Sequence, residues 1–285
     1  TVGVISPWNF PVNLILAPLA GIFAAGNRTM IKPSELTPAT SEVTKKMFEA
    51  YFDKSEAAVF TGDAEVGAAF SALPFDHLLF TGGTQIGKKV MKAASDNLVP
   101  VTLELGGKSP VIVDDDANLS DVAKKVMRGK TMNAGQICLA PDYLMLPKGK
   151  SQEFATASND AVSEMFADLK YNDDYTSVIN ERHYERINEL VSDAKEKGAE
   201  VVQINPADED FEQQELHKIP PTLVLNPTDD MKIMQEEIFG PVLPVKEYED
   251  FDETVNYVNS KDRPLGLYLF SKDKNKEKKV IDNTT

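Results

Sequence analysis

The chain has 285 residues, of which 42% are hydrophobic, so it can bury a sizeable core and we expect two domains rather than one. Its formal net charge of −15 at pH 7 would repel nucleic acid and anionic membrane surfaces, so we expect neither as a partner. A single cysteine rules out an internal disulfide, which fits the cytoplasm, and no apolar run is long enough to span a membrane.

Strand-like and helical segments alternate from the start of the chain, which predicts an α/β fold built from strand–helix units. In the first part we expect strands at residues 1–5, 29–32, 57–60, 76–82 and 101–106. We read the last of these, "VTLELG", as a buried parallel strand. We expect helices at residues 14–25, from 37 onward, at 66–69 and from the glycines at 82–83 onward.

Two of these helices show an apolar face at helical spacing, which is typical of a helix that packs on a core. In the helix opened by Thr37 and Pro38, the face consists of Val43, Met47, Ala50 and Tyr51. In the helix after the glycines, it consists of Ile86, Val90 and Ala93.

The pattern starts afresh near residue 107, and we place the boundary between two α/β domains there, at 1–106 and 107–285. In the second domain we expect strands at residues 110–114, 142–147, 200–204, 222–225, 242–248 and 265–271. We expect helices at residues 119–132 and 251–259, with two amphipathic helices between them. The second of these is marked by Ile187, Leu190, Val191 and Ala194.

Three polar residues stand out as candidates for chemistry. Cys138, the only cysteine, lies among small and polar residues in "MNAGQICLAPDY", although a lone cysteine is more often a buried hydrophobe. Glu104 interrupts an apolar strand, which suits a general base in a cleft but also a structural salt bridge or an edge-strand position. Asn9, in the turn "SPWNFP", has an amide that could donate to an oxyanion, although the turn alone indicates only structure.

The stretch "FTGGTQIG", residues 80–87, places glycines between a strand and a helix, where backbone N–H groups can hold a phosphate. Thr84 stands at the third position of the dinucleotide fingerprint G-x-G-x-x-G, where the fingerprint has its second glycine. The acidic candidate for a ribose lies upstream in "KPSE", so a plain glycine-rich turn remains an alternative. The three histidines, His77, His183 and His217, are scattered, and no ligand cluster predicts a metal site.

Six stretches in this order and spacing resemble the aldehyde dehydrogenase superfamily: "PWNFP", "KPSE", "FTGGTQIG", "LELGGKSP", "GQIC" and "EEIFGP". "LAPLAG", "CLAPDY" and "PLGLYLFS" resemble its class-3 branch, and coniferyl aldehyde dehydrogenases above all. The resemblance implies a Rossmann-type cofactor domain at 1–106 and an α/β catalytic domain at 107–285. It also implies that the family's fold is truncated here at both ends, with part of the cofactor domain and a C-terminal segment missing.

The resemblance assigns roles to individual residues. It makes Cys138 the nucleophile, Asn9 the oxyanion donor and Glu104 the general base. It assigns the cofactor to Trp8, Lys32, Glu35, Gly82, Gly83, Ile86, Gly87, Leu105, Glu237 and Phe239. Among these, Lys32 and Glu35 match the residues on the adenosine ribose, and Glu237 matches the acid on the nicotinamide ribose. NAD is the expected cofactor and NADP the alternative, because Glu35 would repel a 2′-phosphate.

The resemblance therefore implies oxidation of an aromatic or medium- to long-chain aldehyde to its carboxylic acid by a cytoplasmic enzyme that forms a homodimer. Two alternatives stay open. One is an enzyme that passes the thioester to coenzyme A, for which Glu104 would be dispensable. The other is a catalytically silent fragment that only binds nucleotide.

Overall fold

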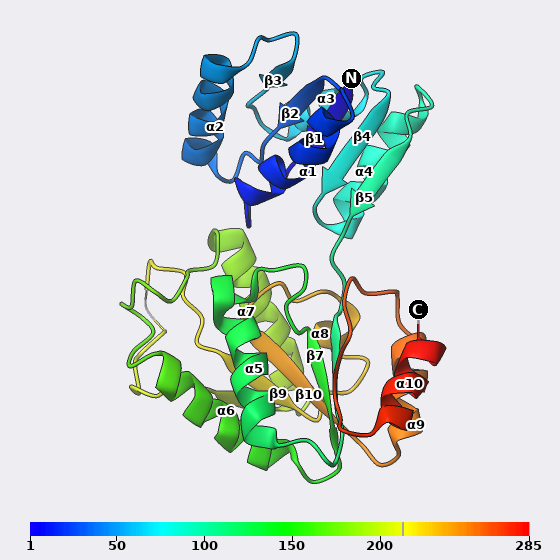
Figure 1. The fold of residues 1–285 in the computed structure, drawn as a ribbon. Coiled ribbons are helices and arrows are strands. Elements are labelled where there is room, and N and C mark those ends of the chain that lie inside the picture. The colour runs from blue at the N-terminus through cyan, green and yellow to red at the C-terminus, as the bar shows by residue number, and fades with distance from the viewer. Residues whose placement is uncertain (213, 285) are drawn as a thin grey trace. The chain divides into compact units, whose positions relative to one another are not determined.

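The computed structural model describes residues 1–212 and 214–284, and the chain forms two compact units, Thr1–Gly106 and Gly107–Thr285 (Figure 1). In each unit helices cover both faces of a largely parallel sheet. This is the α/β architecture that the alternating sequence pattern predicts.

The first unit contains a parallel sheet with the strand order β3-β2-β1-β4-β5. Its strands are β1 (Val2–Ile5), β2 (Thr29–Lys32), β3 (Ala57–Val59), β4 (His77–Thr81) and β5 (Val101–Glu104). Its helices are α1 (Asn13–Ala24), α2 (Pro38–Tyr51), α3 (Ala64–Ser71) and α4 (Thr84–Ser95). The strand order reverses between β1 and β4, and open α/β sheets bind ligands at such a switch point, beyond the carboxyl ends of the strands.

Alternation along the strands divides the core of this unit into two layers. One layer joins β1 and β2 to α1 and α2 and includes Val4, Ile15, Leu19, Ile31 and Phe48. The other joins β4 to α3 and α4 and includes Phe70, Leu78, Phe80, Val90 and Ala94.

The expected apolar face of α2 is wrong. Val43, Met47 and Tyr51 are exposed, whereas the residues that α2 buries are Ser41, Thr44 and Phe48. Two of the buried residues are small, and their hydroxyl groups are satisfied by backbone carbonyls, so they can be buried without an unpaired polar group. The apolar stripe that the periodicity picks out is therefore not the side that packs on the sheet.

Two further expectations need correction. In α4 the buried face is Gly87, Val90 and Ala94, and Ile86 lies on the exposed side at 52% exposure. Strand β5 is parallel to β4, as expected, but it lies at the edge of the sheet, and its residues are half-buried or exposed in alternation. A strand paired on one side only has no second neighbour to bury it.

The second unit contains a sheet with the order β11-β6-β7-β10-β9-β8, in which β8 alone pairs antiparallel among the strands of the described residues. Its strands are β6 (Pro110–Val113), β7 (Tyr143–Pro147), β8 (Glu200–Gln203), β9 (Thr222–Leu225), β10 (Val242–Tyr248) and β11 (Tyr268–Phe270). Its helices are α5 (Leu119–Thr131), the 3₁₀ turn η1 (Met132–Gly135), α6 (Ser151–Met165), α7 (Glu181–Glu196), α8 (Lys232–Gln235), α9 (Phe251–Asn259) and α10 (Lys274–Asn283).

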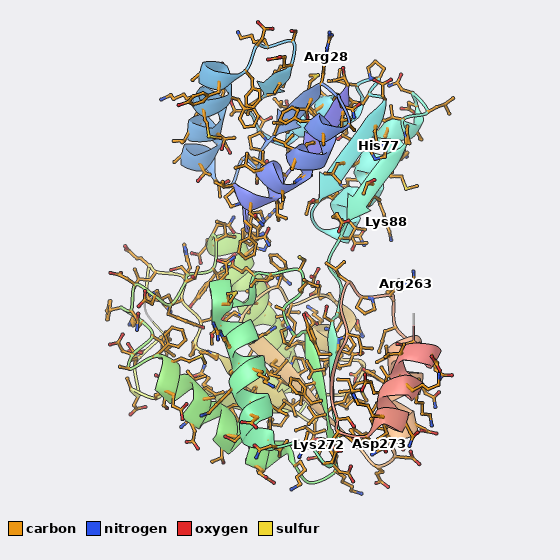
Figure 2. All side chains as sticks on the ribbon, in the orientation of Figure 1. Arg28, His77, Lys88, Arg263, Lys272 and Asp273 are labelled. Carbon is orange, nitrogen blue, oxygen red and sulfur yellow. The ribbon has the colours of Figure 1, made fainter. Side chains whose placement is uncertain are left out.

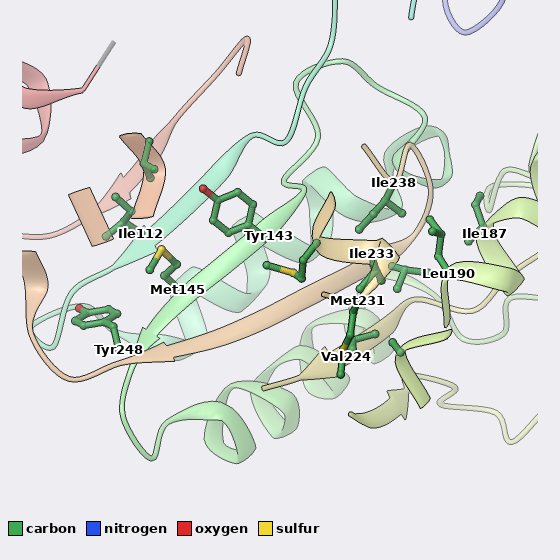
Figure 3. Packing of buried hydrophobic residues seen from close by; sticks show 14 of the residues in the cluster. Ile112, Tyr143, Met145, Ile187, Leu190, Val224, Met231, Ile233, Ile238 and Tyr248 are labelled. Atoms are coloured by element: carbon green, nitrogen blue, oxygen red, sulfur yellow. The ribbon is translucent and has the colours of Figure 1, made fainter. Parts of the chain in front are cut away.

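This unit also has a core on each face of its sheet. Figure 3 shows the layer in which Ile112, Tyr143, Met145 and Val224 of the strands meet Ile187 and Leu190 of α7. The opposite layer joins the same strands to α5 and α6 and includes Val111, Val126, Met127, Leu144 and Phe154. These layers support the loops at the strand ends that carry the remaining candidate residues.

A side-chain cap stabilises the start of α10, and an ion pair joins this helix to the end of β6. Asp273, labelled with Lys272 in Figure 2, caps α10 through the N–H of Asn275 at 2.7 Å. Lys276 pairs with buried Asp114 at 2.5 Å, just after β6. Within residues 1–212 and 214–284, no helix combines the length and apolar character needed to cross a membrane.

Candidate functional site

The candidate residues of the first unit gather at the carboxyl ends of its parallel strands. Trp8 and Asn9 follow β1 in a turn and are both half-buried. Lys32 ends β2, and Glu35 follows it. Because β1 lies between β2 and β4, the sheet brings these turns to one edge.

Lys32 is 3% exposed, and its ammonium group donates to the carbonyl of Pro33 at 2.8 Å and to the carboxylate of Glu35 at 3.3 Å. The side chain of Glu35 is 44% exposed, so the pair is buried at its cation and open at its anion. Buried lysines are rare unless paired, so this arrangement is a built polar site at the end of β2.

The turn between β4 and α4 provides a helix N-terminus that no side chain caps. A Cβ on Gly82 would lie 2.6 Å from the ring of Phe80, whereas one on Gly83 would meet nothing within 4 Å. Gly87 is buried against Leu105, to whose Cδ2 a Cβ would approach at 2.8 Å. Such an uncapped N-terminus, next to open space at Gly83, suits an anion such as a phosphate.

Glu104 is the last residue of β5 and is exposed. The expectation of a buried strand around Glu104 is therefore wrong, and the edge-strand position that the sequence left open is the one observed. Its position at the carboxyl end of the strand still places it on the same edge as the turns after β1 and β4.

In the second unit, Cys138 is half-buried in the loop that follows α5 and η1. Three consecutive residues before it, Asn133, Ala134 and Gly135, have positive φ angles of 50°, 51° and 69°. Left-handed backbone is costly for residues with a Cβ and persists only where the surroundings enforce it. The loop before the thiol is therefore a shaped and strained turn.

Gln136 ties this loop to the rest of the unit. Its amide is 2% exposed and donates to the carbonyls of Asn133 and Ser177, each at 3.0 Å, while its oxygen accepts the N–H of Ile179 at 2.9 Å. On the other side of the thiol, the hydroxyl of Tyr268 donates to the carbonyl of Leu139 at 2.6 Å. Both flanks of Cys138 are thus anchored.

Glu237 and Phe239 lie in a loop that touches the cysteine loop. A Cβ on Gly135 would lie only 2.3 Å from the carbonyl oxygen of Gly240, so the two backbones meet there. Phe239 has a φ of 49°, so it is another left-handed residue that is not glycine. Burial raises the pKa of Glu237 to about 7, and the N–H of Gly107, which bonds to the carboxylate, opposes the rise.

Several charged residues hold the loop of Glu237 in place by ion pairs and hydrogen bonds. The sequence alone assigned no role to them. Lys108 and Asp142 form an ion pair next to it, and Arg186 donates to the carbonyls of Glu237 and Ile238. The sequence contains a signal for these charged pairs, since Lys108 lies in "LELGGKSP" and Asp142 in "CLAPDY", each beside an apolar strand. A charge beside a buried strand indicates a pair, although the sequence does not name the partner.

Lys130 is a third cation without an assigned role, and it lies behind the cysteine loop. It is 1% exposed, and its ammonium group donates to the carbonyl of Pro141 at 2.8 Å. Burial lowers its pKa to about 8, opposed by the negative charge of Asp142. Among the described residues, no group of three or more His, Cys, Asp or Glu side chains could hold a metal ion.

Comparison of the sequence with known proteins identifies the family. The sequence profile described as "Aldehyde dehydrogenase family" matches residues 1–285, and the chain belongs to this family. It is 61% identical over 284 residues to a probable coniferyl aldehyde dehydrogenase of Caulobacter vibrioides, covering 100% of this chain and 59% of that protein. It is 55% identical over 283 residues to a coniferyl aldehyde dehydrogenase of Pseudomonas sp., covering 99% and 59%. The resemblance seen in the six motifs is thereby confirmed.

Solved structures agree on the fold. "Substrate bound state of Staphylococcus Aureus AldH" is similar with a TM-score of 0.91 and 39% identity, over 99% of this chain and 61% of that one. The aldehyde dehydrogenase of Mycobacterium tuberculosis complexed with NAD+ is similar with a TM-score of 0.88 and 28% identity, over 99% and 59%. The chain thus spans about three-fifths of the length of its relatives, and the expected aldehyde dehydrogenase-like fold is confirmed.

Proposed function

We propose that this chain carries the catalytic core of an NAD-dependent aldehyde dehydrogenase that oxidises coniferyl aldehyde or a similar aromatic or medium- to long-chain aldehyde to its acid. The observation that carries the proposal is the close approach of Gly135 to Gly240, which puts the loop of Cys138 beside the loop of Glu237. A nucleophile beside the segment assigned to the nicotinamide ribose is the arrangement that hydride removal requires. The 61% identity to a probable coniferyl aldehyde dehydrogenase supports the substrate class.

The residues present fit a dinucleotide. The uncapped N-terminus of α4 at Gly83 offers N–H groups to a pyrophosphate, and the Lys32–Glu35 pair offers a cation and an exposed carboxylate to the adenosine ribose. Glu237 would hold the nicotinamide ribose. We assign the remaining contacts to Trp8, Gly82, Ile86, Gly87, Leu105 and Phe239. Since Glu35 would repel a 2′-phosphate, NAD is preferred to NADP.

The chemistry follows from three side chains. The thiolate of Cys138 attacks the aldehyde carbon, and the Asn9 amide and the Cys138 N–H donate to the oxyanion; one such donor is worth about 3 kcal/mol of barrier. Bound NAD supplies the acceptor for the hydride that leaves this carbon. The carbon then remains on Sγ as a thioester, and Glu104 takes a proton from the water that hydrolyses it. The exposure of Glu104 supports its access to water.

The test is NADH formation from NAD and coniferyl aldehyde by this chain, beside its Cys138→Ala variant. We expect turnover that the variant loses by at least about a thousandfold, while NADH binding measured by calorimetry stays within about twofold, because the thiol makes bonds only to substrate. Equal turnover in Cys138→Ala would contradict the assignment of the nucleophile.

The same assay separates the two alternatives. Turnover that requires coenzyme A and survives Glu104→Gln would indicate transfer of the thioester to another thiol. Cofactor binding without NADH formation by the folded chain would indicate a silent nucleotide-binding fragment.

The assignment of Thr1–Gly106 to cofactor binding and of Gly107–Thr285 to catalysis belongs to this proposal. So do a homodimeric state and a cytoplasmic location, both of which rest on the resemblance. Sedimentation of the protein would test the dimer.

A further inference from the structure

Lys108 and Asp142 form an ion pair that is almost removed from water, with side chains 11% and 4% exposed. The ammonium group of Lys108 also donates to the carbonyls of Ile233 at 2.7 Å and of Glu236 at 3.0 Å, so its three donors have three acceptors. Burying two charges costs several kcal/mol per ion before their attraction is counted. Such a pair is weak evidence for stability, and its geometry points to another role.

The pair holds the backbone on both sides of Glu237. Lys108 bonds to the carbonyl of Glu236, and the second oxygen of Asp142 accepts the N–H of Ile238 at 2.8 Å. The peptide groups before and after Glu237 are therefore both fixed to one rigid pair. Fixing these two peptide planes sets the direction in which the Glu237 side chain leaves the backbone.

We propose that Lys108 and Asp142 are positioning residues that aim the carboxylate of Glu237 at the nicotinamide ribose. This inference rests on the proposed function, because it takes from it the role of Glu237. Lys108 lies two residues before β6, and Asp142 lies directly before β7. The sheet therefore fixes the positions of both members of the pair. Arg186 of α7, which donates to the carbonyls of Glu237 and Ile238, supports the same segment from another element.

Electrostatics agrees with this role. The charge of Asp142 raises the pKa of Glu237 and that of Lys108 lowers it, so the intact pair adds little net charge beside the carboxylate. A lone aspartate or a lone lysine in the same place would shift the ionisation of Glu237 as well as its direction.

The experiment compares Lys108→Met, Asp142→Asn and their combination with the parent chain, and Lys232→Met is the control. Lys232 is an exposed lysine of α8, one residue from a carbonyl that Lys108 binds, so its replacement removes the same charge without the ion pair. Calorimetric NADH affinity, the KM for NAD, kcat, and hydrogen exchange of the Ile238 amide are measured for each.

We expect Lys108→Met to weaken NADH binding and raise the KM for NAD at least tenfold, with kcat changed less than threefold. Exchange of the Ile238 amide should accelerate at least tenfold, and the control should match the parent. Because the two residues act as one unit, the double variant should be no worse than Lys108→Met alone. If Lys108→Met does not fold, Asp142→Asn, which keeps an acceptor for Ile238 but breaks the ion pair, provides the readouts of NADH affinity and KM.

Unchanged NADH affinity and KM in a variant that is merely easier to unfold would overturn the inference, since the pair would then be only structural. Glu237→Gln separates this failure from that of the proposed function. If Glu237→Gln binds NADH like the parent, the ribose role of Glu237 falls. If Glu237→Gln weakens binding and Lys108→Met does not, the positioning role alone falls.

Discussion

The two units place their candidate residues by different means. In the first unit the residues follow the carboxyl ends of β1, β2, β4 and β5 within a few positions, so the order of the parallel sheet alone brings them to one edge. In the second unit the loops of Cys138 and Glu237 are shaped by left-handed residues and by charged side chains far away in sequence. Lys108 and Glu236, for example, are separated by 128 positions.

This difference indicates which positions of each unit should be sensitive to amino-acid substitution. A turn positioned by strand ends tolerates a small side chain wherever the backbone leaves space. A loop positioned by close backbone contacts and buried polar bonds has no such space, and a single methyl group there must move the main chain.

The largest effect should come from Gly135→Ala. The new Cβ would lie 2.3 Å from the carbonyl oxygen of Gly240 and would sit on a residue with φ of 69°. Left-handed alanine costs about 1–2 kcal/mol, and forced main-chain shifts add about 1–3, so we expect about 2–5 kcal/mol lost from the free energy of unfolding. Urea unfolding followed by circular dichroism measures it, and a loss below about 1 kcal/mol would show that the two loops can separate freely.

Gln136→Ala should have the next largest effect. It removes two donors and one acceptor and leaves the carbonyl of Ser177 and the N–H of Ile179 without this partner. Buried polar groups that lose a partner cost about 1–3 kcal/mol, so we expect about 2–3 kcal/mol and a lower rate of aldehyde oxidation. Gln152→Ala is the control, because that glutamine is exposed and binds exposed Glu200. Equal unfolding curves for the two variants would contradict the anchoring role.

Cofactor affinity should depend on the ionisation of Glu237, whose pKa burial raises to about 7. Only the carboxylate can accept from two ribose hydroxyls, so NADH affinity should rise with pH between about 6 and 8, by roughly tenfold. Calorimetry across this range tests it, and Glu237→Gln should give a flat profile. A parent profile as flat as that of the variant would remove Glu237 from the cofactor site.

The same shift has an opposite consequence for folding. Because the folded-state pKa lies above the ordinary value of 4.5, the contribution of Glu237 to stability is full below about pH 4.5 and is lost as the pH rises through about 7. Cofactor binding and folding therefore respond to this carboxyl in opposite directions.

Gly83→Ser should have the smallest effect. Gly83 is the N-cap of α4, has an ordinary φ of −70°, and has open space where a Cβ would lie. Serine is a slightly better N-cap than glycine, so we expect a gain of a few tenths of a kcal/mol. A loss of more than about 1 kcal/mol, against the same unfolding assay used for Gly135→Ala, would break the contrast between the two units.

Much of the fold could be predicted from the sequence, because buried parallel strands and amphipathic helices leave strong patterns. The expected helix at 251–259 has the bounds of α9, and the expected strands at 29–32 and 242–248 are those of β2 and β10. The turn α8 was missed because four residues are too few for a helical period. The buried face of α2 was misjudged because Ser41 and Thr44, which pack inward, are not apolar.

The site was predictable only in part, for a related reason. The turns after β1, β2 and β4 carry their signal in adjacent residues, as glycines or as the Lys32–Glu35 pair. The left-handed Ala134 carries none, because its conformation is imposed by its neighbours, and the known tolerance of asparagine for this conformation at Asn133 is too weak a signal to predict the turn. The exposure of Glu104 likewise depends on which strand has a neighbour, and a single strand's sequence does not say so.

Trp8 is the only tryptophan of the chain, and it lies beside Asn9 in the half-buried turn after β1. Fluorescence excited selectively in indole therefore comes from a single loop at the end of a single strand. The protein has an intrinsic optical reporter in the loop of Asn9, the proposed oxyanion donor. A change in the surroundings of this loop would therefore change the tryptophan emission, with no attached dye needed and no other tryptophan contributing.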